Sequence, residues 1–208
     1  MRFLLYRPGP FLRALYWNGL RQRLGMAWRR LIRAQPRAVS LASHSEAITR
    51  YGTICRQLLS GLRYGPDLTG ARVCELGAGN CLATAALFLG LGARQVEVFE
   101  PYAPVVDDRQ IKVLTSLKAQ GLPLDVESTL KGAPPQLNEQ RITWHRKFVE
   151  NDDGNQQFDF IFSFSVMEHI EDLPGALRVC HKMLKPGGAM LHVVDLGGTV
   201  LLKTPCPL

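Results

Sequence analysis

The chain has 208 residues, 46% of them hydrophobic, which is enough for one domain with a substantial core and an appendage. The formal net charge is +7, but residues 1–37 hold nine arginines and no acidic residue, which leaves 16 basic against 18 acidic residues elsewhere. The basic character therefore belongs to an N-terminal arm, and the body lacks the positive charge typical of proteins that bind nucleic acid.

Residues 1–42 are expected to form a basic, amphipathic helical arm, and residues 43–208 the domain body. Between Phe11 and Arg33, apolar side chains recur on one helical stripe, at Leu12, Tyr16, Leu20, Leu24, Ala27 and Leu31. Three interpretations remain open. The arm is a helix packed on the body as a lid over the site, a helix lying on an anionic membrane surface, or a nucleic-acid-binding or organelle-targeting segment.

The body alternates strands and helices. A capping-box pattern at residues 43–46 predicts the start of a helix, and Gly61 is expected to end it. Strands are predicted at 72–76, 95–100, 142–148, 158–164 and 189–195, helices at 80–91, 105–120 and 173–184, and a loop at 121–140. This order predicts an α/β fold, with a Rossmann-like, doubly wound, mostly parallel sheet covered by helices on both faces.

The cysteines and the apolar runs exclude several classes of protein. The five cysteines form no CxxC pair and most lie in apolar runs, so we expect reduced, buried thiols and no metal site. The longest apolar run without charge, Cys81–Ala93, is too short to span a bilayer. We expect a cytoplasmic protein, peripheral to a membrane if the arm binds one.

The turn after the first strand is the strongest local signal. Gly77-Ala78-Gly79 lets backbone approach a ligand closely, and the helix that follows offers free N–H groups. Glu100 ends the second strand, where a carboxylate can accept both ribose hydroxyl protons. A nucleoside-containing ligand is therefore predicted. Leu82 replaces the third glycine of the dinucleotide fingerprint, which disfavours a nicotinamide oxidoreductase.

Four segments stand in a characteristic order: ELGAGN (75–80), VEVFEP (96–101), FDFIFSFSVMEHIED (158–172) and LKPGGAMLHVVD (184–195). Together they resemble the motifs of class I S-adenosylmethionine-dependent methyltransferases of the small-molecule type. The resemblance implies S-adenosylmethionine as cofactor, with Glu75 near the amino end of its methionine part, Glu100 on its ribose, Ser163 and Phe164 beside the transfer site, and Phe148 near the adenine. The full set of cofactor-binding residues that it implies is Glu75, Gly77, Ala78, Gly79, Asn80, Glu100, Pro101, Phe148, Ser163 and Phe164.

His169 is the candidate catalytic base, because it follows the fourth strand near the implied transfer site. Its alternative role is to brace the loop by hydrogen bonds. A base is required only when the acceptor atom is protonated, so a methyltransferase can work without one.

The chain departs from the family at its C-terminal end. Only 13 residues follow Asp195, too few for the helix and antiparallel strands that complete the family's sheet. We therefore expect a domain that is truncated after the fifth strand and has an open sheet edge. A second copy in a homo-oligomer, or another partner chain, would cover that edge.

The sequence thus predicts an enzyme that transfers a methyl group to a small-molecule, sugar or lipid-like acceptor. Nucleic acid is not the expected substrate, because no Asn/Asp-Pro-Pro-Tyr run stands at residues 163–166 and no paired cysteines are present. The alternative is a non-catalytic fragment, or a cofactor-binding or interaction protein of the same fold.

Overall fold

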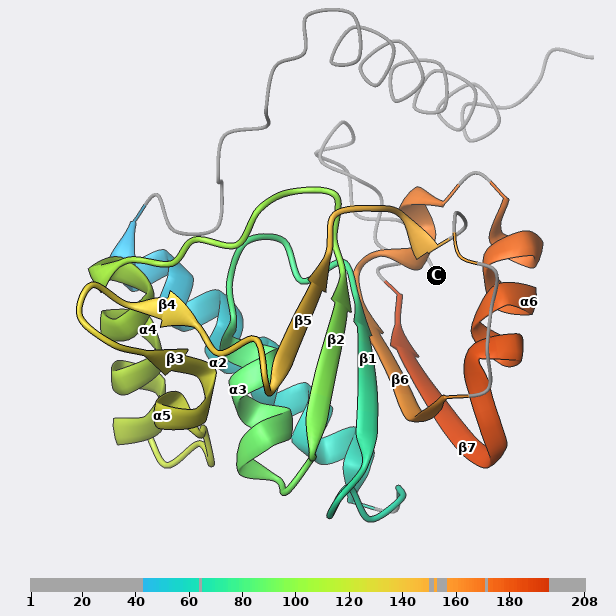
Figure 1. Cartoon of the computed structure of the whole chain (residues 1–208), viewed down its shortest axis with the longest axis horizontal. Coiled ribbons are helices and arrows are strands. Elements are labelled where there is room, and N and C mark those ends of the chain that lie inside the picture. The colour runs from blue at the N-terminus through green and yellow to red at the C-terminus, as the bar shows by residue number, and fades with distance from the viewer. Residues whose placement is uncertain (1–42, 64, 150–151, 153–156, 171, 195–208) are drawn as a thin grey trace, which may run out of the picture. The chain divides into compact units, whose positions relative to one another are not determined.

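The computed structural model describes residues 43–63, 65–149, 152, 157–170 and 172–194. The predicted arm, Asp195 and Cys206 lie outside the described residues. A five-stranded sheet has the order β5-β2-β1-β6-β7, and every neighbouring pair in it is parallel (Figure 1). Its strands are Arg72–Leu76 (β1), Gln95–Phe99 (β2), Ile142–His145 (β5), Phe158–Phe164 (β6) and Leu184–Val193 (β7).

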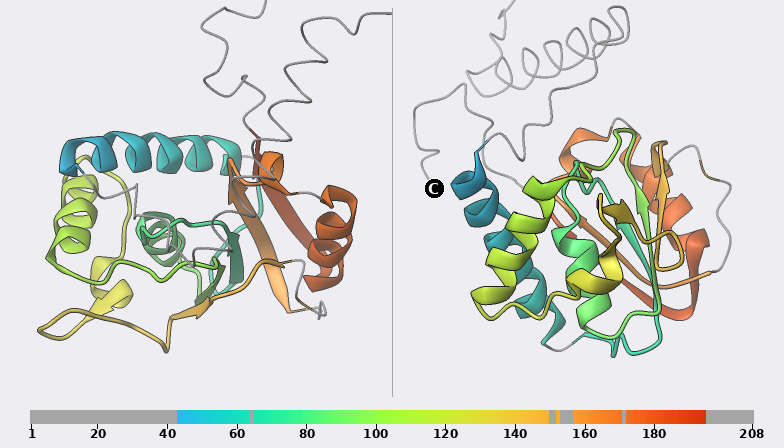
Figure 2. Two further views of the ribbon diagram at one scale, coloured as in Figure 1. Left: turned by 90° about the horizontal axis from the view of Figure 1, so that it is seen from above. Right: turned by 60° about the vertical axis from the view of Figure 1, so that its left-hand side comes forward.

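Helices cover both faces of the sheet. They are His44–Leu62 (α2), Ala83–Gly90 (α3), Asp108–Ala119 (α4), Val126–Thr129 (α5), the 3-10 helix Met167–His169 (η3) and Leu173–Met183 (α6). Figure 2 shows α2, α3 and α4 on one face and α6 on the other. The fold class predicted from the alternation of strands and helices is confirmed.

Local side chains fix where several helices begin. The Ser43 hydroxyl accepts the backbone N–H of Glu46 at 3.3 Å, as the capping box predicts. Asp107 caps α4 and Asp172 caps α6, where its Oδ1 accepts the N–H of Gly175 at 2.9 Å. These short polar side chains satisfy backbone donors that the first helical turn leaves free.

The largest core lies between the sheet and α2, α3 and α4. Seven of the eight residues of α3 are buried, and Phe88 meets Phe160 and Phe162 of β6 edge to face, with ring centroids 6.1 and 5.7 Å apart. A second core forms where α6 packs on the opposite face through Ala176, Cys180 and Met183. Because helices cover both faces, four of the five residues of β1 and five of the seven residues of β6 are buried.

Several predicted boundaries are wrong. The helices predicted to begin at residues 80 and 105 begin at Ala83 and Asp108, and the strand predicted at 142–148 ends at His145. Gly61 does not end the first helix, which continues to Leu62. A Cβ atom at Gly61 would lie 2.8 Å from Cδ2 of Leu191 on β7, so the glycine allows close packing at this position. Residues 121–140 are not a loop, since they hold α5 and a short hairpin of Leu130–Lys131 (β3) and Gln136–Leu137 (β4). The last strand starts at Leu184, because residues 185–188 continue it past an irregularity in the pairing with β6.

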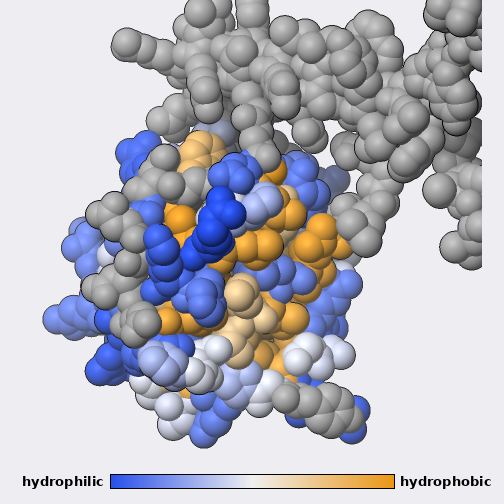
Figure 3. Space-filling model, turned by 90° about the vertical axis from the view of Figure 1, so that its right-hand side faces the viewer, coloured by the Kyte–Doolittle hydropathy of each residue, from blue (hydrophilic) through white to orange (hydrophobic). Residues whose placement is uncertain are grey.

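β7 lies at one edge of the sheet. On the side that carries α6 and β7, hydrophobic surface gathers between hydrophilic rims (Figure 3). Four large apolar side chains of these elements are 37–39% exposed. They are Leu173 and Leu177 of α6, Met190 of β7, and Val194, the residue that follows β7.

Candidate functional site

The candidate site lies at the carboxyl edge of the sheet, the upper edge in Figure 1. The strand order reverses at β1, which pairs with β2 on one side and with β6 on the other. Ligands of open α/β sheets bind at such a switch point, because loops from neighbouring strands diverge there. The segments that follow β1, β2 and β6 therefore meet in one place.

The glycine turn that leaves β1 is closely enclosed. Gly77 and Gly79 have φ angles of +70° and +66°, a region that other residues rarely adopt. A Cβ atom on Gly77 would lie 2.3 Å from Cγ2 of Val166, in the loop after β6. A Cβ atom on Gly79 would lie 3.5 Å from the hydroxyl oxygen of Tyr51 on α2. The turn thus passes between two segments that are distant in sequence.

Glu100 ties β2 to the glycine turn. Its carboxylate accepts the backbone N–H of Gly79 at 2.8 Å through Oε2 and that of Tyr102 at 3.2 Å through Oε1. The side chain is only 5% exposed, and this burial raises the pKa of the carboxyl group while the two N–H groups oppose the rise. Each carboxylate oxygen can accept more than one hydrogen bond, so both remain available to ligand hydroxyls.

Glu75 is the second carboxyl group of the site. It is 3% exposed, its Oε1 accepts the hydroxyl of Thr84 in the first turn of α3, and its Oε2 has no hydrogen-bond partner. Burial raises its pKa to about 8; the Thr84 hydrogen bond opposes this rise and the nearby Glu100 adds to it. A buried oxygen without a partner is costly, so a ligand donor at Oε2 would relieve that cost.

Asn80 supplies a further unpaired atom at the same turn. It is buried, its backbone carbonyl accepts the N–H of Val105 at 3.0 Å, and its Oδ1 has no partner. Two orphaned acceptor atoms, an enclosed glycine turn and a carboxylate open to hydroxyls fit a ligand with a cationic group and a ribose. These residues fit S-adenosylmethionine.

The residues expected after β6 face different sides of the sheet. Ser163 is fully buried, and its hydroxyl is 2.8 Å from Nδ1 of His192 on β7. It shares a face with Leu76, its register partner on β1, whereas Glu75 is opposite Phe162. Phe164 packs against the core on the Glu75 side. The structure therefore brings Phe164, more than the Ser163 hydroxyl, to the face of the two carboxyl groups.

Of the remaining predicted residues, Ala78 is buried in the core, whereas Phe148 and His169 are exposed. Pro101 and Ala78 flank the glycine turn and Glu100 in the chain, and Phe148, three residues beyond β5, is 51% exposed. His169 is exposed at the end of η3, and its backbone N–H donates to the carbonyl of Val166 at 2.9 Å.

Three side chains that enclose or support the site were missed. Tyr51 and Val166 could not have been found, because neither stands in a local pattern that points to the turn. Thr84 did leave a signal, since it is the only polar side chain in α3.

The backbone at Ser165 has a φ of +51°, which is uncommon for a residue other than glycine, at the point where the chain leaves β6.

The described residues were compared with the requirements of a membrane-spanning helix and of a metal site. None of their helices is both long and apolar enough to cross a membrane. Nor do three or more His, Cys, Asp or Glu side chains come together, within the described ranges, as a metal site requires. Four cysteines in this part of the chain are buried free thiols.

Comparison with known proteins gives partial matches to curated and solved proteins. The chain is 43% identical over 51 residues to the zebrafish (Danio rerio) protein "Arginine-hydroxylase NDUFAF5, mitochondrial". This match covers 24% of the chain and 16% of the zebrafish protein. A methyltransferase structure from Mesorhizobium loti is 19% identical (67% and 50% of the two chains, TM-score 0.42). The N-methyltransferase NodS from Bradyrhizobium japonicum, solved with S-adenosyl-L-homocysteine, is 19% identical (67% and 59%, TM-score 0.39). The chain thus spans little more than half the length of these solved proteins.

A family model decides the relationship. Residues 48–201, most of the chain, match the model of the family described as "Methyltransferase domain". This range contains the whole described sheet, the glycine turn and both site carboxyl groups. The chain therefore belongs to the methyltransferase-domain family, the class I S-adenosylmethionine-dependent methyltransferases.

Proposed function

We propose that this chain binds S-adenosylmethionine at the glycine turn and transfers its methyl group to a small-molecule, sugar or lipid-like acceptor. One observation carries the proposal. The Glu100 carboxylate accepts the backbone N–H of Gly79 in the turn, and Glu75 and Asn80, which precede and follow the turn in the chain, each hold a buried oxygen atom without a partner.

Each part of the site has a role in this proposal. Glu100 accepts hydrogen bonds from the ribose hydroxyls, and Oε2 of Glu75 accepts a hydrogen bond from the ammonium group of the methionine part. The backbone of the glycine turn lies beneath the ligand. When bound, the cofactor supplies an electrophilic methyl group on a sulfonium. The chain's own contribution is to align the acceptor and exclude water, and alignment alone can supply roughly 7–11 kcal/mol of the barrier.

His169 is the proposed base for acceptors that must lose a proton. His169 is exposed and lies in the segment that follows β6. The same segment carries Val166, whose side chain packs against Gly77 of the glycine turn. An imidazole is the side chain best matched to proton transfer near neutral pH. Replacing His169 with asparagine should lower the rate of transfer without weakening the binding of the cofactor.

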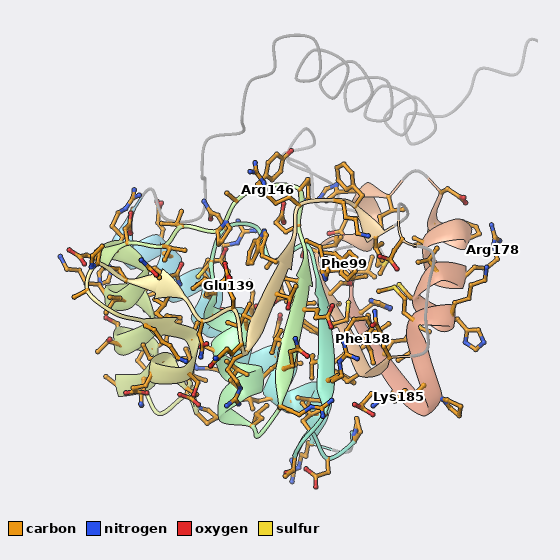
Figure 4. All side chains as sticks on the ribbon, viewed as in Figure 1. Phe99, Glu139, Arg146, Phe158, Arg178 and Lys185 are labelled. Carbon is orange, nitrogen blue, oxygen red and sulfur yellow. The ribbon has the colours of Figure 1, made fainter. Side chains whose placement is uncertain are left out.

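The test is binding first and transfer second. Calorimetric titration with S-adenosylmethionine should show micromolar affinity, and Glu100→Gln should weaken it by about 10- to 100-fold, since hydrogen bonds to charged groups contribute about 1.5–3 kcal/mol. Glu139→Gln is the matched control, because Glu139 is an exposed acid after the β3–β4 hairpin (Figure 4). Equal binding by both variants, or no binding by the folded protein, would refute the site.

The acceptor is found by mass spectrometry of an acceptor mixture incubated with the protein and cofactor. A product heavier by one methylene group supports methyl transfer. Because part of the chain resembles a protein named as an arginine hydroxylase, the same experiment looks for products heavier by one oxygen atom. Tight cofactor binding with neither product would favour the alternative, a cofactor-binding protein that is not an enzyme.

Location and partners are part of the same proposal. We propose a cytoplasmic protein whose residues 1–42 contact anionic membrane surfaces, because this segment combines nine arginines with a predicted apolar helical stripe that contains four leucines. Co-sedimentation with anionic vesicles at low and high salt tests this. We also propose that a second copy covers the β7 edge, where Met190 and Val194 are exposed, and sedimentation velocity over a range of concentrations tests that association.

A further inference from the structure

A buried hydrogen-bonded pair lies beneath the proposed cofactor site. Thr84, on the first turn of α3, donates its hydroxyl to Oε1 of Glu75 on β1, and both residues are buried. The hydrogen bond holds one oxygen of the carboxyl group, so the other, Oε2, is left as its single oxygen without a partner. The side chain of Glu75 is therefore fixed in direction as well as in depth.

No positive charge balances Glu75 among the described groups that interact with it. Glu100 follows β2, Cys55 lies on α2, Cys81 precedes α3 and Cys74 adjoins Glu75 on β1, and each of these groups is neutral or negative. The register partner of Glu75 on β6 is Phe162, and α2 also brings the Tyr51 hydroxyl to the turn at Gly79. In the absence of a cation, such a buried carboxyl group favours its protonated form.

We propose that Thr84 is a positioning residue that directs Oε2 of Glu75 toward the cationic end of the cofactor, and that the buried Glu75 carboxyl group, which has no cation beside it, releases one proton when that cation binds. The inference rests on the proposed function, because it takes the ammonium group of S-adenosylmethionine as the cation. The O–H bond of the Glu75 carboxyl breaks, its proton passes to the solvent buffer, and the carboxylate accepts an N–H of the ammonium group. No redox or covalent step is involved.

A binding step that releases a proton depends on pH in a defined direction. With a Glu75 pKa of about 8 in the ligand-free protein, the ionised fraction rises about tenfold for each pH unit below that value. Affinity for S-adenosylmethionine should therefore rise about tenfold from pH 6 to pH 7. The ligand's own amino group stays mostly protonated over this range, so its titration does not produce the trend.

The first test counts protons. Calorimetric titrations at pH 6.5 in two buffers of different ionisation enthalpy should give a release close to one proton for the native chain and close to zero for Glu75→Gln. Thr84→Val should weaken binding at pH 6.5 and move the pH dependence upward, because the hydroxyl stabilises the ionised carboxylate. Thr84→Ser keeps the hydroxyl and should restore both the affinity at pH 6.5 and the pH dependence of binding. If Thr84 only filled space in the core, the serine variant would not restore them.

The second test needs no ligand. In protein labelled with carboxyl-¹³C glutamate, the signal missing from Glu75→Gln identifies Glu75, and it should titrate near pH 8. Titration in the ordinary glutamate range near 4.5 would overturn the inference whatever the cofactor does. Cofactor binding without proton release would overturn it while the proposed function stands. Absence of binding to a folded chain would overturn both.

Discussion

Substitution of the first glycine in the turn isolates one steric contact. In Gly77→Ala, the new methyl group would lie 2.3 Å from Cγ2 of Val166, and the residue would keep a φ of +70°. The left-handed conformation costs about 1–2 kcal/mol for a residue with a Cβ atom, and overpacking costs about 1–3 kcal/mol more. We therefore expect Gly77→Ala to lower the free energy of unfolding by about 2–5 kcal/mol.

Gly79→Ala is the matched control for backbone strain. Its φ is +66°, but the nearest atom to a new Cβ is the Tyr51 hydroxyl at 3.5 Å, which is ordinary contact. Only the conformational cost of about 1–2 kcal/mol should appear there. The difference between the two variants then measures the clash with Val166, and the double variant Gly77→Ala/Val166→Ala should remove most of that difference.

Urea denaturation followed by circular dichroism measures five free energies of unfolding: those of the native chain, the single variants Gly77→Ala, Gly79→Ala and Val166→Ala, and the double variant. Equal destabilisation by Gly77→Ala and Gly79→Ala would refute the clash. A clash that persists after Val166→Ala would show that another atom opposes the methyl group. Either result would mean that the loop after β6 does not lie against the turn as described.

Two further outcomes are expected. Glu97→Ala should destabilise the fold by about 1.5–3 kcal/mol in urea denaturation, because the buried Glu97 carboxylate accepts hydrogen bonds from Arg72 at 2.5 Å and His145 at 2.9 Å. Glu127→Ala, which breaks the exposed pair with Lys118, should change little, and equal effects of the two substitutions would contradict this. Ligand-free protein should also lose stability as pH rises from about 4.5 to above 8, because the native state keeps the Glu75 proton that the unfolded chain releases near 4.5. That interval corresponds to at most about 5 kcal/mol, and Glu75→Gln should abolish this part of the pH dependence; an unchanged profile in the variant would assign the loss to other groups.

Much of the fold followed from patterns confined to a few neighbouring residues. Phe158–Phe164 is a strand at the predicted bounds, because its run of aromatic and β-branched residues has no competing helical period. Ser43 caps its helix because the hydroxyl and the N–H that it accepts are only three residues apart. The hairpin of β3 and β4 escaped prediction because strands of two residues carry no periodicity.

The sequence alone determined that a glycine turn follows one strand and that an acid ends the next, and together these point to a nucleoside-containing cofactor. Only the tertiary structure decided that Thr84 holds Glu75, that Val166 lies against Gly77 and that Tyr51 reaches Gly79. Tyr51 and Val166 lie far along the chain from the turn, and all three contacts depend on how the strands pair and the helices pack. Local periodicity places residues on a face of their own element, but it does not state which other element that face will meet.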